Sequence, residues 1–275
     1  MAESAASSGQ ARMVRAGHIE LSVMERGRGM PLVLVHGFPL DRRMWDAQIE
    51  HFAKRRRVIA PDLRGFGSSP PVQGATSIEQ MADDLDALLT ALGVDQPVVL
   101  CGLSMGGYVA FQFWRKYSAR LRGLVLCDTR AVADTSEGAQ GRLKQAELVA
   151  REGTAPLVET MLPKLLAPST LSTRPLVAEL VQTMILAASR EGVVAALKAL
   201  AARPDVRGYL PRIKTPTLVV VGQHDAISTP AEMRLLAQAM PRAEFVMIED
   251  CGHMSPMENP SSFNRAVETY LSVLA

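Results

Sequence analysis

The stretch of residues 97–108, PVVLCGLSMGGY, constrains the fold of this chain more than any other. It opens with a short apolar run of the kind that a buried strand needs, and over residues 107–114 apolar side chains recur at helical spacing. Ser104 lies between the two patterns, with Gly102 and Gly106 two residues away on either side. Because glycine permits tight backbone turns, the stretch predicts a strand that passes at once into a helix and presents one serine at the corner.

Patterns of buried strands and amphipathic helices alternate along most of the chain, which predicts a mostly parallel sheet covered by helices on both faces. A hairpin over residues 13–25 is expected at one edge of this sheet. The strands expected after it are 31–36, 58–60, 97–101, 121–127, 217–221 and 243–248, and the main helices are 44–52, 77–92, 107–114, 230–240 and a last one from residue 260.

Residues 129–211 have a different character. They contain no strand pattern, and their helical windows, separated by Gly and Pro signals, are 139–150, 157–166, 176–189 and 192–201. We therefore expect one α/β core, formed by residues 13–128 and 212–275, with a helical segment inserted before the last two strands. The first 12 residues are expected to be disordered.

The composition excludes several classes of function. The 30 basic and 28 acidic side chains leave a formal charge of +2, too close to balance to indicate a nucleic-acid or membrane partner. The three widely spaced cysteines match neither a disulfide framework nor a metal site, so we expect no metal and a reducing compartment. No secretory signal pattern and no run of 18 apolar residues occurs, and we expect a cytoplasmic protein.

Two polar groups follow later strands at the positions where a reactive serine would need them. A serine hydroxyl becomes a good nucleophile only when a base takes its proton, and the base needs an acid to orient it. Asp225 comes after the strand 217–221, and His253 comes after the strand 243–248. The chain order Ser104, Asp225, His253 is the order that accompanies this kind of strand-to-helix serine. We therefore predict that these three residues are catalytic.

Other polar residues compete for these roles. Asp128 also follows a buried strand and is the alternative acid, although Asp225 is favoured. His36 is interpreted as a packing and hydrogen-bonding residue, and Asp62 and Arg64 as residues that fix a glycine-rich loop.

Five short motifs together resemble the α/β-hydrolase superfamily. They are HGF at 36–38, DLRGFGSS at 62–69, GLSMGG at 102–107, GQHD at 222–225 and CGH at 251–253, and they extend over most of the chain. The first and third motifs are most similar to the branch of esterases, 3-oxoadipate enol-lactonase-like hydrolases and cofactor-free haloperoxidases. The resemblance implies the α/β-hydrolase fold, with an eight-stranded type of sheet and a helical lid formed by residues 129–211.

Acyl transfer passes through an oxyanion that needs preorganised backbone donors. In this fold one N–H belongs to the residue after the nucleophile, here Met105. The resemblance implies Phe38 as the second donor. Because both donors are backbone groups, the sequence indicates their positions rather than their side chains.

We expect a serine hydrolase that cleaves a small or medium carboxylic ester or lactone through an acyl-enzyme, with no metal or organic cofactor. Perhydrolase or haloperoxidase activity and carbon–carbon bond hydrolysis remain open, because both use the same three residues. A non-catalytic ligand receptor on the same scaffold is the alternative from another class. The expected partner is a small-molecule substrate, and a homo-oligomer is left open. Because the chain has Ser104 at the turn, it is not expected to share the activity of the relatives that use a carboxylate nucleophile.

Overall fold

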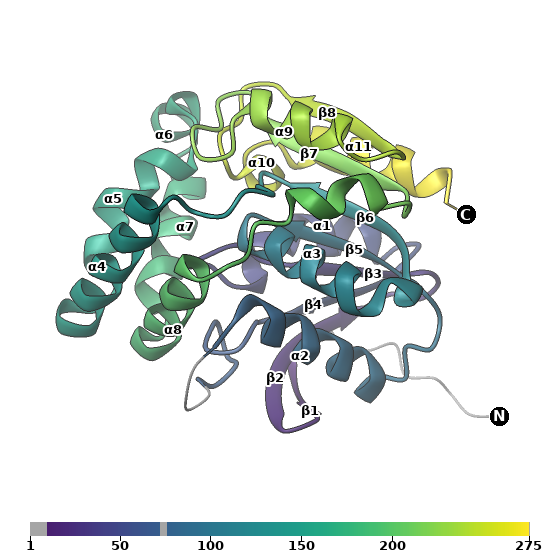
Figure 1. The fold of residues 1–275 in the computed structure, drawn as a ribbon, viewed down its shortest axis with the longest axis horizontal. Coiled ribbons are helices and arrows are strands. Elements are labelled where there is room, and N and C mark those ends of the chain that lie inside the picture. The colour runs from purple at the N-terminus through teal and green to yellow at the C-terminus, as the bar shows by residue number, and fades with distance from the viewer. Residues whose placement is uncertain (1–9, 72–75, 275) are drawn as a thin grey trace.

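One eight-stranded sheet forms the centre of the molecule (Figure 1). The structure is a computed structural model, and it describes residues 10–71 and 76–274. The strands lie in the order β1-β2-β4-β3-β5-β6-β7-β8. The hairpin β1–β2 joins the sheet antiparallel to β4, and every later pairing is parallel. The predicted mostly parallel sheet is thus confirmed. Its strands are β1 (Arg12–Ala16), β2 (Ile19–Arg26), β3 (Pro31–Val35), β4 (Arg57–Pro61), β5 (Val98–Leu103), β6 (Leu121–Cys127), β7 (Thr217–Gly222) and β8 (Ala243–Ile248).

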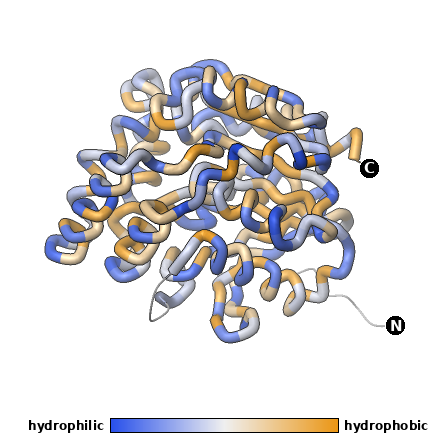
Figure 2. The backbone as a smooth tube through the Cα atoms, viewed as in Figure 1, coloured by the Kyte–Doolittle hydropathy of each residue, from blue (hydrophilic) through white to orange (hydrophobic). Residues whose placement is uncertain are grey.

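The burial of the strands follows from their place in the sheet. Every residue of β3, β5 and β7 is buried, as expected for Val- and Leu-rich strands covered on both faces. Strand β8 lies at an edge and is only partly buried. Figure 2 shows hydrophobic residues gathered along the central strands and alternating with hydrophilic residues along the helices. The predicted disorder of residues 1–12 lies mostly outside the described residues, but β1 already includes Arg12.

Helices cover both faces of the sheet. Helices α2 and α3 pack on each other, with α3 against β5 and β6, while α9 packs on β7 and β8, and α1 packs on β4 and α11. Helix α2 begins with the capping box of Ser77 and Gln80, which satisfies two backbone donors at its start. The elements around the core are η1 (Arg42–Trp45), α1 (Asp46–Phe52), α2 (Ile78–Ala91), α3 (Met105–Tyr117), η2 (Ser118–Arg120), α9 (Pro230–Gln238), α10 (Ser255–Glu258) and α11 (Pro260–Ser272).

The helical insertion, residues 129–211, lies beside one end of the sheet (Figure 1). Helix α4 packs on α8, and α7 packs on both α5 and α6. The short helix α6 was not predicted, because six residues are too few for a helical periodicity to appear. The insertion contains α4 (Ser136–Glu152), α5 (Ala155–Leu165), α6 (Pro168–Thr173), α7 (Pro175–Ala187) and α8 (Arg190–Ala201), and η3 (Arg207–Arg212) leads from it back into the core.

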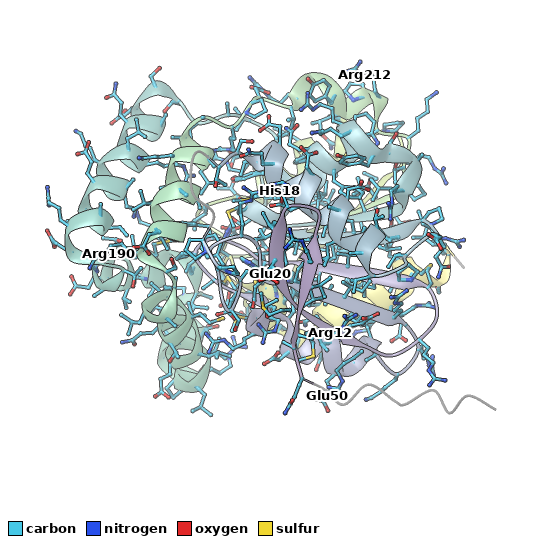
Figure 3. All side chains as sticks on the ribbon, turned by 90° about the horizontal axis from the view of Figure 1, so that it is seen from below. Arg12, His18, Glu20, Glu50, Arg190 and Arg212 are labelled. Carbon is cyan, nitrogen blue, oxygen red and sulfur yellow. The ribbon has the colours of Figure 1, made fainter. Side chains whose placement is uncertain are left out.

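Polar side chains such as Arg190 on α8 and His18 in the β1–β2 turn project outward (Figure 3). Within the described residues no single helix is long and apolar enough to cross a membrane, and only α7 and α8 together, bent by 96°, reach that length and hydropathy.

The glycine-rich loop after β4 fixes the insertion to the core. A Cβ atom added to Gly192 on α8 would lie 1.9 Å from the carbonyl oxygen of Gly65, so the two backbones are in direct contact. The loop itself is held by Asp62, which accepts N–H bonds from Arg42 at 2.9 Å and Ser68 at 3.0 Å. The buried pair of Arg64 and Asp84 adds two bonds of 2.5 and 2.6 Å. These contacts agree with the structural interpretation of Asp62 and Arg64.

The backbone contact between Gly192 and Gly65 predicts the effect of one methyl group. We expect Gly192→Ala to lower the free energy of unfolding by about 3 kcal/mol, because neither backbone can yield without separating α8 from the loop. Gly141→Ala is the matched control, since it is also helical and has no atom within 4 Å of the added carbon. The control should gain up to ~1 kcal/mol from helix propensity. Urea denaturation measures both, and equal effects would contradict the account.

Candidate active site

The chain turns from β5 into α3 at Ser104, where the backbone is strained. Its φ of 52° and ψ of −109° lie in a region that residues with a side chain rarely adopt. Hydrogen bonds of the Ser104 backbone hold this conformation. The Ser104 N–H donates to the Cys127 carbonyl at 2.9 Å, and the Ser104 carbonyl accepts from the Thr129 hydroxyl at 2.8 Å and the Gly107 N–H at 2.9 Å. The predicted serine corner is therefore present, with its side chain only partly buried.

The glycines beside the serine are required by close packing. A Cβ atom added to Gly102 would lie 2.2 Å from the carbonyl oxygen of Gly106, and one added to Gly106 would lie 2.3 Å from that of Val35. The turn is therefore pressed against the end of β3 as well as against itself. In addition, a Cβ atom at Gly37 would lie 3.5 Å from the Ser104 Cβ, which places the loop after β3 beside the serine.

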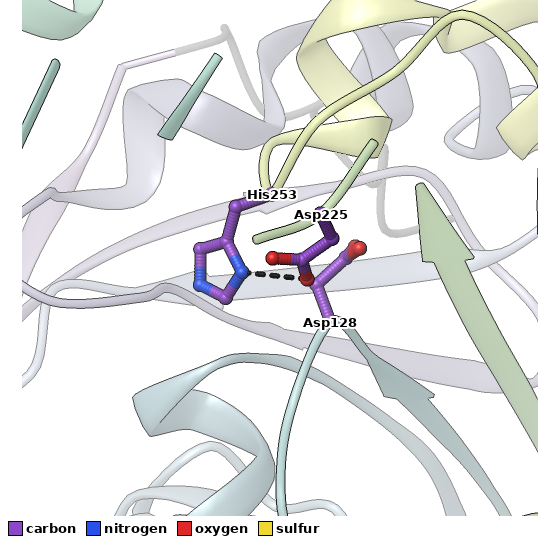
Figure 4. Close-up of side chains that lie close together, drawn as sticks. All are labelled: Asp128, Asp225 and His253. Carbon is purple, nitrogen blue, oxygen red and sulfur yellow. Dashed lines mark hydrogen bonds and ion pairs between the residues drawn. The ribbon is translucent and has the colours of Figure 1, made fainter. Parts of the chain in front are cut away.

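The predicted acid and base form a buried hydrogen bond. Asp225 follows β7, His253 follows β8, and the His253 Nδ1 lies 2.8 Å from the Asp225 Oδ2 (Figure 4). Their exposed fractions are only 3% and 2%, so water screens the pair weakly. The other oxygen, Asp225 Oδ1, accepts the N–H groups of Ile227 at 2.7 Å and Ser228 at 3.0 Å.

These bonds define which ring nitrogen of His253 carries the hydrogen that faces Asp225. The Asp225 carboxylate acts only as an acceptor, so the hydrogen in its bond to the ring is carried by His253 Nδ1. The Nε2 atom of the neutral ring is then an acceptor, which is the form that a general base requires.

Asp128 makes a different set of bonds. It accepts the Gly222 N–H at 2.8 Å and the Ser255 hydroxyl at 2.6 Å, while His253 bonds to Asp225 instead. Burial, followed by the nearby Asp225 charge, raises the pKa of the Asp128 carboxyl well above its ordinary value. Asp128 therefore links the end of β6 to β7 and α10 as a group that resists ionisation.

Asp128, Asp225 and His253 also satisfy the spacing of a metal site, since one potential ligand atom of each lies within 4.8 Å of the others. Both oxygens of Asp128 and both of Asp225 are already engaged with hydrogen-bond donors. We therefore describe the cluster as a hydrogen-bond network.

Of the two predicted oxyanion donors, Met105 follows the serine and Phe38 lies in the loop after β3. Met105 is the first residue of α3, where helical geometry leaves the N–H without an intrahelical partner. Phe38 follows Gly37, whose backbone lies against Ser104, and its ring packs edge-on against Phe66 with the centroids 6.2 Å apart.

His36 supports this loop from below. Its Nε2 accepts the Leu63 N–H at 2.9 Å, so Nδ1 carries the ring hydrogen and donates to the Gly37 carbonyl at 2.9 Å. Burial lowers the pKa of His36 below its ordinary value of 6.5. The ring thus joins the loop after β3 to the glycine-rich loop in its neutral form.

Three polar residues at this edge were missed by sequence reasoning. Thr129 holds the serine carbonyl, Ser255 holds Asp128, and the buried Glu258 binds the backbone on both sides of His253. The available signal was their position, one residue after Asp128 and two and five residues after His253.

The chain belongs to the α/β hydrolase fold family, whose model matches residues 30–260. The resemblance seen in the five sequence motifs is thereby confirmed. The chain is 30% identical to 3-oxoadipate enol-lactonase 2 of Acinetobacter baylyi, over 87% of this chain and 88% of that protein. It is also 30% identical to 2-hydroxy-6-oxo-2,4-heptadienoate hydrolase of Pseudomonas putida, over 95% of this chain and 96% of the relative.

Among solved structures, a thermophilic esterase from Thermogutta terrifontis is similar with a TM-score of 0.94 and 48% identity. The match covers 96% of this chain and 99% of the esterase.

The neutral buried His36 predicts a pH dependence of stability. Above pH 6.5 the ring is neutral in both the folded and the unfolded state, so its full contribution is present. Below pH 6.5 the unfolded chain takes up a proton that the folded chain excludes. The free energy of unfolding should then fall by up to about 1.4 kcal/mol per pH unit through this residue.

Urea denaturation of the wild type and His36→Gln between about pH 7.5 and 5.5 tests this dependence. The variant should show the shallower slope of stability against pH. Identical slopes would contradict the neutral assignment of His36.

Proposed function

We propose that the protein is a serine hydrolase that cleaves small or medium carboxylic esters or lactones. The single observation that carries the proposal is the buried 2.8 Å hydrogen bond between His253 and Asp225. The pair lies at the carboxyl ends of the parallel strands, as the strained Ser104 does. A parallel sheet brings the carboxyl ends of β5, β7 and β8 to one edge, where a nucleophile, a base and an acid can act together.

The first half of the reaction forms an acyl-enzyme. His253 Nε2 takes the proton of the Ser104 hydroxyl as Oγ attacks the carbonyl carbon, and the carbonyl oxygen becomes an oxyanion. The backbone N–H groups of Phe38 and Met105 stabilise that oxyanion. When the tetrahedral intermediate collapses, the carbon–oxygen bond breaks and the leaving alcohol takes the proton from His253.

Water completes the cycle. His253 Nε2 removes a proton from water as the water oxygen attacks the acyl carbon, and the same proton returns to Ser104 when the second intermediate collapses. Asp225 stabilises the imidazolium in both halves. Because two N–H groups hold its other oxygen, Asp225 needs no reorganisation when the ring becomes charged.

The relatives support ester and lactone substrates. The esterase at 48% identity is nearer to this chain than either curated relative reported above, and one of those is an enol-lactonase. The heptadienoate hydrolase, at 30% identity, supports carbon–carbon bond hydrolysis as the second candidate. Assays of an ester chain-length series, a lactone and a dienoic diketone on the purified protein separate these substrates. Hydrogen peroxide with a short carboxylic acid tests perhydrolysis, and absence of all turnover would favour a ligand receptor.

The proposed enzyme has a lid over its substrate and works in the cytoplasm. We take the helical insertion as the lid over the substrate, because it adjoins the sheet end that carries the site. The free, buried thiols of Cys101, Cys127 and Cys251 support a reducing, cytoplasmic environment.

Replacing the nucleophile tests the mechanism. Ser104→Ala should lower kcat for a p-nitrophenyl ester by at least about 10⁴-fold, because no other group supplies the attacking oxygen. A fluorophosphonate probe should add to the wild type at Ser104 and leave the variant unlabelled, as peptide mass spectrometry can determine. Near-wild-type turnover by the variant would overturn the mechanism.

A pair of matched substitutions tests the identity of the acid. Asp225→Asn should lower kcat by about 10⁴-fold, since an amide favours the wrong tautomer of His253. Asp128→Asn should keep kcat within about 10-fold of the wild type, because Asp128 resists ionisation and the hydrogen bond of His253 goes to Asp225 instead. Steady-state kinetics at neutral pH measures both variants. The reverse ranking would assign the acid role to Asp128.

A further inference from the structure

Glu258 is a buried acidic residue that the proposed reaction does not use. It ends the short helix α10, and only 1% of its surface is exposed. Burying a carboxylate is costly unless hydrogen bonds replace its water. Glu258 has four such bonds, two to each oxygen, and all four donors are N–H or hydroxyl groups. The side chain therefore acts as a pure acceptor, as an ionised carboxylate does.

One oxygen holds the backbone on both sides of His253. Glu258 Oε1 accepts the Gly252 N–H at 2.8 Å and the Met254 N–H at 3.2 Å. Two bonds to one atom fix the orientation of the peptide groups that flank the histidine. The direction in which the His253 ring leaves the chain thus depends on the position of Glu258.

The other oxygen holds the helical insertion. Glu258 Oε2 accepts the Ala167 N–H and the Thr170 hydroxyl, both at 2.7 Å. The contact between the two segments is close, because a Cβ atom at Gly252 would lie 2.6 Å from the Ala167 nitrogen. Residues 165–167 are buried against this loop.

We propose that Glu258 is a positioning residue that couples the docking of α6 to the alignment of His253 with Asp225. The inference rests on the proposed function in one respect, that His253 is the base. If α6 moves away, Oε2 loses two hydrogen-bond donors. The carboxylate can replace those two bonds only by turning Oε2 toward water. That rotation withdraws Oε1 from the peptide groups beside His253. The docking of α6 and the alignment of His253 therefore both depend on the hydrogen bonds of the Glu258 carboxylate.

Three variants separate the two halves of this bridge. Glu258→Ala removes all four bonds, and Thr170→Val removes only a hydroxyl donor of the insertion. Glu258→Gln retains one acceptor oxygen, which should face Gly252 and Met254, because the opposite orientation would direct its NH₂ group at two N–H donors. Glu249→Ala is the matched control, an exposed glutamate in the same loop four residues before His253.

Each variant is assayed for kcat and KM with a p-nitrophenyl ester and for the downfield NMR signal of the His253 Nδ1 proton. Glu258→Ala should lose about 100-fold in kcat with a much smaller change in KM, as expected for a misplaced base. Glu258→Gln should recover kcat to within about 10-fold of the wild type. Thr170→Val should shift the Nδ1 signal and reduce kcat, whereas Glu249→Ala should change neither.

The NMR measurement keeps this proposal distinct from the proposed function. The Nδ1 signal reports the bond between His253 and Asp225 whether or not the protein hydrolyses an ester. An unchanged signal in Thr170→Val, with wild-type kcat, would overturn the coupling even if Glu258→Ala fails to fold. Retained activity of Ser104→Ala would instead overturn the proposed function and leave the coupling to be judged by the NMR signal alone.

Discussion

The parallel pairing of β3, β5, β6, β7 and β8 is the constraint on which the site depends. Parallel strands end at the same edge, so loops that lie far apart in sequence meet there. Ser104 follows β5 directly, and Asp225 and His253 lie in the loops after β7 and β8. The strands are held in register by backbone hydrogen bonds and by complete burial of β5 and β7. The sheet therefore supplies the precision of the site, and the loops supply its chemistry.

Three buried carboxyl groups hold the loops at the carboxyl ends of the strands in place. Each accepts backbone N–H groups: Asp128 binds β7, Asp225 binds its own loop, and Glu258 binds the histidine loop and the insertion. Backbone donors are fixed by the fold, so they satisfy these groups without the entropy cost of long basic side chains. Asp128 and Asp225 differ in their surroundings, because burial raises the pKa of Asp128 whereas Asp225 bonds to an imidazole.

Sequence reasoning predicted the features that local pattern encodes and missed those that depend on contact between distant segments. The apolar runs predicted the strands, because strands covered on both faces need apolar side chains. The glycines beside Ser104 predicted the sharp turn, which follows from backbone sterics. Both Asp225 and Asp128 follow neighbouring strands, and the sequence favoured Asp225; the structure has the His253 bond on Asp225. Helix α6 and the bridge made by Glu258 were missed, because a six-residue helix has little periodicity and a glutamate beside a histidine loop normally indicates a solvated surface.

The central claim is that Ser104 becomes covalently acylated during turnover. Stopped-flow mixing with a p-nitrophenyl ester, followed by acid quench and peptide mass spectrometry, measures this most directly. The account predicts a burst of p-nitrophenol of about one equivalent per active site, wherever deacylation is the slower step, and an acyl group on the peptide that carries Ser104. Steady turnover with no acyl adduct on that peptide, under conditions in which a fluorophosphonate does label Ser104, would contradict it.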